Sequence, residues 1–299
     1  MRPKPKQIIS ASRRTDIPGC YPQWFMEGIQ KGSFQVTNPF NQQTRTVDVS
    51  PELTHSIVFW SKNYGPFLDL NAHSILKEMG YHLFFNFTLN SPQPILEPRV
   101  PPLEERFAQA RILCKDIGAN ALSWRFDPIC FFQDAAGNQK NNLSAFKTIA
   151  DTMGEMGVSS CVTSFYAPYK KVETRINKYP PDQKIRFTQL ERQERIDLIQ
   201  GMAEYLKLRG IQLHLCTQGE LEPHLEGIPA NACVDGKKLK ALYGGNPETR
   251  RDYGQRSKAG CRCTRSVDIG SYKEHPCAHN CLFCYARTQQ DLTGQGKKI

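Results

Sequence analysis

The chain alternates between short apolar segments and amphipathic segments, and this alternation limits its fold more than any other feature. The apolar segments are rich in Ile, Val, Phe and Leu, as expected for parallel strands buried on both faces. They cover residues 7–12, 33–37, 56–60, 82–88, 121–125, 160–165 and 211–216, with a further short one at 232–234. Helices are expected between them at 22–30, 65–79, 103–117, 143–156 and 190–208. This rhythm is typical of a parallel barrel or a doubly wound sheet, and the number of strands favours an α/β fold with a TIM-like (β/α) barrel, complete or incomplete.

The rhythm stops near Gly219, where Gly, Pro and Cys become frequent. We therefore expect a barrel domain over residues 1–218 and, over residues 219–299, a cysteine-rich C-terminal cap that packs on the barrel. A chain of 299 residues is long enough for one large domain with such an appendage. There is no run of about 18 apolar residues and no signal-peptide core, so we expect a cytoplasmic protein with no membrane partner.

Cysteine usage points to metal chemistry. The chain has 11 cysteines, and seven of them lie between Cys216 and Cys284. Disulfides are rare in the cytosol, so clustered cysteines there more often bind metal or take part in catalysis. The four scattered cysteines are interpreted as small buried apolar side chains. They are Cys20, Cys114, Cys130 and Cys161.

Residues 277–285 read CAHNCLFCY and contain three cysteines in the spacing C-x3-C-x2-C, with Phe283 directly before the last one. Three thiolates suit a four-iron (4Fe-4S) cluster in which one iron has no protein ligand. An open coordination position also distinguishes catalytic from structural zinc sites. The motif therefore predicts a reactive cluster held by Cys277, Cys281 and Cys284, which makes residues 219–299 an iron-sulfur cap.

This spacing and its aromatic residue resemble the signature of radical S-adenosylmethionine enzymes. The resemblance implies that the open iron binds S-adenosylmethionine, that reductive cleavage yields a carbon radical, and that Phe283 and Tyr285 lie at the cofactor. It also implies an electron donor such as flavodoxin or ferredoxin. Members usually carry the motif near the N-terminus, whereas here 15 residues follow Cys284. The rest of the cofactor pocket is therefore expected to come from earlier segments.

Four further cysteines precede this motif and form a candidate second site. Cys261 and Cys263 are separated by one residue, and in an extended segment both side chains fall on one face. With Cys216 and Cys233 they could hold a second four-iron cluster or a tetrahedral zinc ion. The cluster is favoured because the spacing matches no common zinc motif; the alternative is two buried cysteines and a chance pair. His275 and His279 are expected to hydrogen-bond cluster sulfurs.

Charged and amide residues follow six successive predicted strands. In a barrel these strand ends share one rim, where active sites are built. Arg supplies paired donors for a carboxylate or phosphate, and Lys supplies a point charge. We therefore expect a pocket for a small polar or anionic substrate. Its candidate catalytic residues are Arg13, Arg14, Asp16, Lys62, Arg125 and Asp127.

Several short motifs narrow the resemblance further. They are SRRTDIP at 12–18, FWSKN at 59–63, WRFDP at 124–128, CRC at 261–263 and SVDIGSY at 266–272. Together they look like one bacterial and archaeal family, the domain of unknown function 1848, noted for C-terminal cysteines like those of radical S-adenosylmethionine enzymes. The resemblance spans essentially the whole chain. It implies a cluster and names no reaction.

Net charge leaves two functions open. The chain carries +10, and from residue 236 onward there are 13 Lys and Arg against five Asp and Glu. This basic tail indicates either a surface for nucleic acid or another anion, or compensation of thiolate charge. The favoured function is a radical S-adenosylmethionine-like enzyme. The alternative is a zinc- or cluster-stabilised nucleic-acid-binding protein, and a radical enzyme acting on nucleic acid would combine both.

Overall fold

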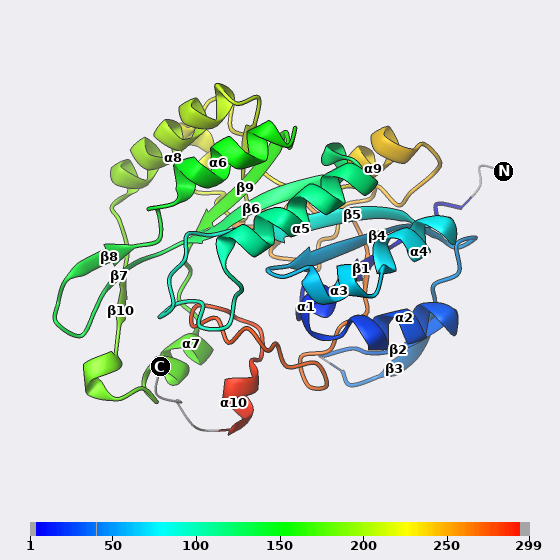
Figure 1. Cartoon of the computed structure of the whole chain (residues 1–299), viewed down its shortest axis with the longest axis horizontal. Coiled ribbons are helices and arrows are strands. Elements are labelled where there is room, and N and C mark those ends of the chain that lie inside the picture. The colour runs from blue at the N-terminus through cyan, green and yellow to red at the C-terminus, as the bar shows by residue number, and fades with distance from the viewer. Residues whose placement is uncertain (1–3, 40, 294–299) are drawn as a thin grey trace.

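Seven parallel strands form the central sheet of the computed structural model, which describes residues 4–39 and 41–293 (Figure 1). From β1 to β11, each strand of this sheet pairs with the next one along the chain, without the reversal of a doubly wound sheet. This is the strand order of a barrel. In spatial order the strands are β11 (Gln212–Leu215), β9 (Ser160–Phe165), β6 (Leu122–Ile129), β5 (His82–Thr88), β4 (Thr54–Ser61), β1 (Gln7–Ala11) and β12 (Val267–Asp268).

The sheet is open. In the part of the chain that the structure describes, β11 and β12 are its two edges and do not pair with each other. The expected strand at 232–234 does not form, and the chain there makes only an isolated bridge between Leu215 and Ala230. It turns so that the Cys233 sulfur lies 3.8 Å from that of Cys216. The α/β class and the barrel order are therefore confirmed, whereas a closed barrel is not formed.

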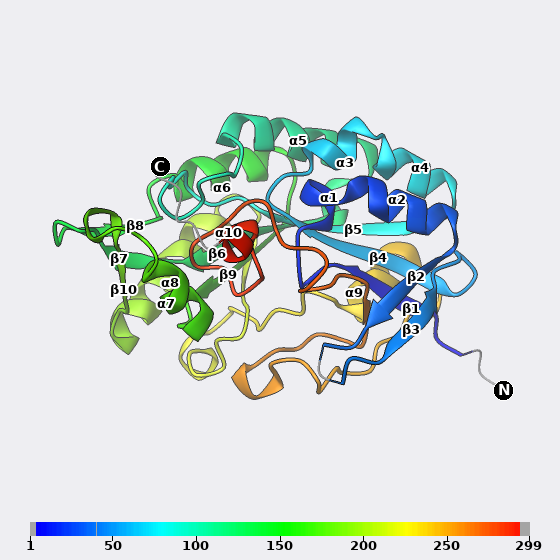
Figure 2. The same cartoon turned by 90° about the horizontal axis from the view of Figure 1, so that it is seen from below.

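Helices cover one face of the sheet (Figure 2). Their apolar sides share one large core with Phe59, Phe85 and Trp124 of the strands. The expected helix at 65–79 is two helices, because Asn71 between them has a φ of 52°, which breaks a right-handed helix. The helices on this face are α2 (Pro22–Gln30), α3 (Gly65–Asp69), α4 (Ala72–Glu78), α5 (Leu103–Asp116), α6 (Phe146–Glu155) and α8 (Arg192–Lys207).

The segment at 33–37 is a strand but lies outside the central sheet. It forms β2 (Ser33–Thr37), which pairs antiparallel with β3 (Thr44–Asp48). Its residues alternate between buried and exposed, as in a hairpin covered on one face. The sequence also gave no signal for a small antiparallel sheet of β7 (Phe131–Gln133), β8 (Gln139–Asn141) and β10 (Arg186–Thr188).

The chain after β11 crosses the opposite face of the sheet (Figure 2). Leu239 of α9 (Gly236–Tyr243) packs there with Val58 and Phe84. Further on, β12 pairs with β1, and α10 (Gln289–Thr293) follows the last cysteine. The cysteine-rich region therefore supplies an edge strand of the sheet and covers the face opposite the helices, which we call the inner face. Among the described helices, none has the length and apolar character needed to cross a membrane.

Candidate functional site

The carboxyl ends of the strands and the C-terminal loop enclose a cavity of about 390 Å³. Cys277, Cys281 and Cys284 all line it, together with Cys216 and Cys233. Segments far apart in the sequence thus converge on one hollow. The cavity also brings together five of the six predicted charged residues. These are Arg13, Asp16, Lys62, Arg125 and Asp127.

Arg13 and Arg14 are neighbours in the sequence but have different partners and different positions relative to the cavity. The Asp268 carboxylate of β12 accepts a hydrogen bond from the Arg13 backbone N at 2.8 Å and lies 3.9–4.0 Å from the Nε atoms of both arginines. Arg13 Nη2 donates to Ser266 Oγ at 2.7 Å, and its Nη1 is buried without a hydrogen-bond partner. Arg14 donates instead to the Gly270 carbonyl and is not among the residues that line the cavity. Arg13 therefore offers a donor to a ligand, and Arg14 fastens the tail.

Asp16 connects three segments at the floor of the cavity. It lies directly before α1 (Ile17–Cys20), and its Oδ2 accepts hydrogen bonds from Ser61 Oγ at 2.9 Å, Lys62 N at 3.0 Å and His279 Nε2 at 2.8 Å. Burial alone would lower the pKa of His279, but the Asp16 carboxylate raises it to about 9. Asp16 and His279 thus form a charged pair that holds the cysteine loop against the strand ends.

Lys62 is neutralised by a residue that the sequence did not single out. Its Nζ lies 2.5 Å from Glu97 Oε1, and both side chains are largely buried. Burial opposes the charge of Lys62, yet Glu97 raises its pKa, and Lys62 in turn lowers the pKa of Glu97 against the effect of burial. The same Nζ lies 5.3 Å from the centre of the Phe283 ring. Glu97 comes from the proline-rich loop at 91–102, where nothing in the sequence indicated a partner for Lys62.

Arg125 links the strand ends to the second cysteine group. It forms an ion pair with Asp127 and donates from Nη1 to Cys233 Sγ at 3.0 Å. Ser164 Oγ in turn donates to Asp127 Oδ1 at 2.5 Å. Burial opposes the charge of Arg125, but Cys233 and Asp127 raise its pKa well above the usual value. A guanidinium at this distance stabilises a thiolate at Cys233.

The loop that carries the three-cysteine motif is held by Arg175 of α7 (Lys170–Ile176), whose side chain is 1% exposed. Its guanidinium pairs with Asp291 of α10 at 2.9 Å. Nothing in the sequence around residue 175 indicated this role. Its Nη atoms donate at 2.9–3.3 Å to the carbonyls of Cys281, Leu282, Cys284 and Ala286.

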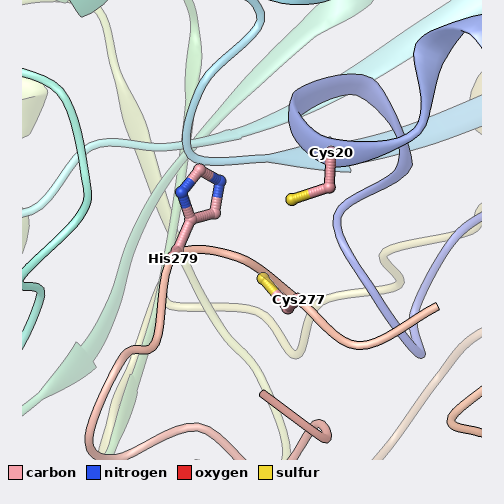
Figure 3. A group of neighbouring side chains, drawn as sticks. All are labelled: Cys20, Cys277 and His279. Carbon is pink, nitrogen blue, oxygen red and sulfur yellow. The ribbon is translucent and has the colours of Figure 1, made fainter. Parts of the chain in front are cut away.

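Cys20 lies beside the motif and is not an isolated apolar side chain. The ligand atoms of Cys20, Cys277 and His279 all lie within 4.8 Å of one another (Figure 3). The Cys20 thiol and burial raise the pKa of Cys277 well above its usual value, and burial does the same for Cys281. Metal binding would have to release these protons.

The second group of cysteines is linked in pairs, and among the described residues no three of its sulfurs all lie within 4.8 Å of one another. Cys216 and Cys233 have their sulfurs 3.8 Å apart. The Cys216 thiol lowers the pKa of Cys233, but Cys263 and burial together raise it. Cys233 lowers the pKa of Cys263, but Cys261 and burial together raise it, and the side chain of Cys263 lowers the pKa of Cys261 to about 7. Four sulfurs placed tetrahedrally at about 2.3 Å from one ion would lie about 3.8 Å apart. The Cys216–Cys233 separation matches that value.

The aromatic residues and His275 take different positions. Phe283 and Tyr285 both line the cavity, and Tyr285 donates from its hydroxyl to the Arg13 carbonyl at 2.6 Å. His275 packs against the rings of Tyr21 and Trp24, with centroids 4.9 and 4.2 Å away. The expected cofactor residues thus face the cavity, whereas His275 lies in an aromatic cluster outside it.

Comparison with known proteins gives a family but no activity. The family described as "Domain of unknown function (DUF1848)" matches residues 8–286. No curated protein matches the chain. A solved structure from Anabaena variabilis, provisionally described as a sugar phosphate isomerase/epimerase, is 15% identical and covers 64% of this chain and 67% of its own, with a TM-score of 0.32. So low a TM-score indicates only a loose likeness of shape.

Proposed function

The chain belongs to the DUF1848 family, and from its own residues we propose that it is an iron-sulfur enzyme of the radical S-adenosylmethionine type acting on a small polar or anionic substrate. One observation supports this most: Cys277, Cys281 and Cys284 line the same cavity as the strand-end cations. A cytoplasmic location and a reductant such as flavodoxin or ferredoxin belong to the same proposal.

The residues present fit such a cluster. Cys277, Cys281 and Cys284 would supply three thiolate ligands that line the cavity, and Lys62 offsets part of the negative charge on Cys281. When bound, the cluster would give one electron to S-adenosylmethionine and so supply a carbon radical that abstracts hydrogen from the substrate. Phe283 and Tyr285 face the same space and would pack against the cofactor.

The charged residues of the cavity differ in whether they can bind a substrate anion. Lys62 and Arg125 already have counter-charges in Glu97 and Asp127, so they add local polarity more than net charge. Arg13 keeps a buried donor without a partner, and an unsatisfied donor of this kind favours a carboxylate or phosphate oxygen. We assign Arg13 to anion binding at this site.

A single metal ion at Cys20, Cys277 and His279 is the second candidate, because these ligand atoms converge. Three protein ligands with an open position are typical of catalytic zinc. Against it, His279 Nε2 is occupied by Asp16 and Nδ1 faces the Arg99 carbonyl at 3.4 Å. That arrangement would also leave Cys281 and Cys284 without a role, so the cluster is the better supported assignment.

For the second cysteine group we propose one tetrahedral zinc ion, around which the sulfurs of Cys261 and Cys263 would have to move closer, in preference to another cluster. The ligands of a four-iron cluster bind different irons and lie further apart than the 3.8 Å between Cys216 and Cys233. Such an ion would stabilise the chain where it crosses the inner face of the sheet.

The rival function, a nucleic-acid-binding protein, rests on the basic tail. Neutralising exposed tail residues would weaken oligonucleotide binding and flatten its salt dependence if that function were correct. We expect instead that Arg125→Ala impairs cofactor binding and that neutralising Lys240 and Arg250 does not. Loss of affinity only in the tail variant, and only for an oligonucleotide, would favour the rival.

Metal analysis after anaerobic reconstitution with iron and sulfide tests the proposal. The wild type is expected to hold about four irons and four sulfides and about one zinc. Replacing Cys277, Cys281 and Cys284 by Ala should remove the iron and keep the zinc. A folded wild-type protein that binds zinc alone would exclude the cluster, and half the iron left in the triple variant would place a cluster at the second site.

A further inference from the structure

A second hollow lies on the same face of the sheet as the first. Side chains alternate along a strand, so Asn86 shares a face with Thr88, Ser123 with Arg125, and Ser160 with Ser164. The second members of these pairs line the cysteine-lined cavity, and the first members line a separate hollow of about 350 Å³. The two hollows are therefore stacked along the inner face, and the second lies nearer the amino ends of the strands.

Cys233 stands at the boundary between the two hollows and lines both. We call the cysteine-lined cavity the upper cavity and the second hollow the lower hollow. Arg125 lines only the upper cavity and contacts the Cys233 sulfur at 3.0 Å. The outer wall of the lower hollow is built by the chain after β11, including the start of α9. A volume of this order is that of a small-molecule pocket and is far below that of a nucleic-acid groove.

Positive charge gathers in this lower hollow. Lys237, Lys238, Arg251 and Arg262 line it, against one carboxylate, Asp235. Arg262 is paired with Glu222 at 2.9 Å. Asp235 is engaged as the cap of α9, where its Oδ1 accepts the backbone N of Lys237 at 2.9 Å. Within residues 4–39 and 41–293, no ion pair joins the other three cations to a carboxylate.

Two of these cations are directed at the pocket by their surroundings. Lys238 Nζ lies over the Phe84 ring, 4.8 Å from its centre, and burial lowers the pKa of Lys238. Arg251 donates from Nη2 to the Cys261 carbonyl, but its Nε is buried without a hydrogen-bond partner. A buried donor left without an acceptor is costly, and a bound anion would satisfy it.

The sheet supplies neutral polar groups opposite these cations. Ser123 and Ser160 have their hydroxyl oxygens 3.4 Å apart, and His214 extends into the same space. No side-chain hydrogen bond of His214 occurs in the described part of the chain. Cations on one wall and hydroxyl and imidazole groups on the other are the partners that a phosphate or carboxylate group requires.

We propose that this lower hollow binds a small oxyanion, a phosphate- or carboxylate-bearing molecule, through Lys238 and Arg251. The site is distinct from the cysteine-lined cavity and does not depend on the chemistry proposed there. It gives the basic tail a function other than contact with nucleic acid, because its half-buried cations face inward onto the sheet. Cys233 connects it to the second metal site.

Isothermal titration of the full chain with pyrophosphate and, separately, with citrate tests this assignment. We expect the wild type to bind at least one of them, and the probe that binds identifies the phosphate or the carboxylate class. Lys238→Met and Arg251→Gln should each weaken binding by about tenfold or more, since each removes a charged hydrogen-bond donor. Lys240→Met, an exposed change on the same helix, should stay within about twofold.

Circular dichroism melting would identify a variant that fails to fold, and the other of the two variants then decides. Arg13→Gln tests whether the anion binds in the cysteine-lined cavity instead, because Arg13 lines that cavity and carries its unpartnered donor. The proposal is overturned if the wild type binds neither probe, if Lys240→Met weakens binding as much as Lys238→Met, or if only Arg13→Gln removes it.

Discussion

Replacing Arg175 by Met should release the cysteine loop from the body of the protein. Arg175 is 1% exposed, and it forms an ion pair with Asp291 while also donating to backbone carbonyls of residues 281–286. Met keeps much of the apolar volume and removes every one of these donors. The Asp291 carboxylate and the carbonyls would then lose their shared partner.

The size of the effect follows from burial. Breaking a buried ion pair by removing one partner costs about 3–5 kcal/mol. Water reaches Asp291, whose side chain is 17% exposed, and this reduces the cost. The carbonyls that lose Arg175 as a donor increase the cost again, because a buried acceptor left unsatisfied costs about 1–3 kcal/mol. We therefore expect the free energy of opening of the loop to fall by about 3–5 kcal/mol.

Hydrogen exchange of peptides covering residues 277–291 measures this opening directly. Arg175→Lys should fall between wild type and Arg175→Met, because Lys keeps the charge but not the planar fork of donors. Lys178→Met, an exposed change near the same helix, should stay within about 0.5 kcal/mol. Unchanged protection of residues 277–291 in Arg175→Met, in a protein whose β5 peptide is also unchanged, would refute the reasoning.

Three further predictions concern single groups. Lys62→Met should cost about 3–5 kcal/mol in the free energy of unfolding by urea, and Glu97→Gln in the same chain should restore most of it; additive losses would contradict a coupled pair. Burial lowers the pKa of His214 to about 4. Between pH 6.5 and 4, His214 therefore gains a proton only in the unfolded chain, and the free energy of unfolding decreases as the pH is lowered. His214→Gln should show a smaller decrease in parallel urea titrations. Cys20→Ala should leave the iron content of the motif site unchanged, as Cys114→Ala should, because the cluster is assigned to Cys277, Cys281 and Cys284; loss of metal in Cys20→Ala alone would favour the single ion at Cys20, Cys277 and His279.

Fold class and most strand positions could be predicted from the sequence because the strands are long apolar runs buried on both faces. Residues 82–88 and 160–165 are strands with the bounds that their composition indicated. Residues 33–37 also form a strand, but their place outside the central sheet could not be predicted. Local composition carries strand propensity, whereas pairing depends on which partner arrives, and here β3 follows directly.

Much of the candidate site could also be predicted from the sequence, because the topology of a parallel sheet brings the residues at its strand ends to one edge. Arg13, Lys62 and Arg125 reach one cavity for that reason. The hydrogen-bonding and ion-pair partners of these residues could not be predicted from the sequence. Glu97 lies in a loop, and Cys20 looked isolated because its neighbour Cys277 is more than 250 residues away. Arg175 likewise acts through contacts between distant segments, which leave no periodic signal.

The most direct test of the account is cleavage of S-adenosylmethionine by the reconstituted protein. The central claim is that Cys277, Cys281 and Cys284 hold an open cluster at the charged cavity. Dithionite-reduced wild type should release 5′-deoxyadenosine, measured by liquid chromatography and mass spectrometry, and the triple Cys→Ala variant should release none. A reduced wild-type protein with an intact cluster that neither binds nor cleaves the cofactor would contradict the claim.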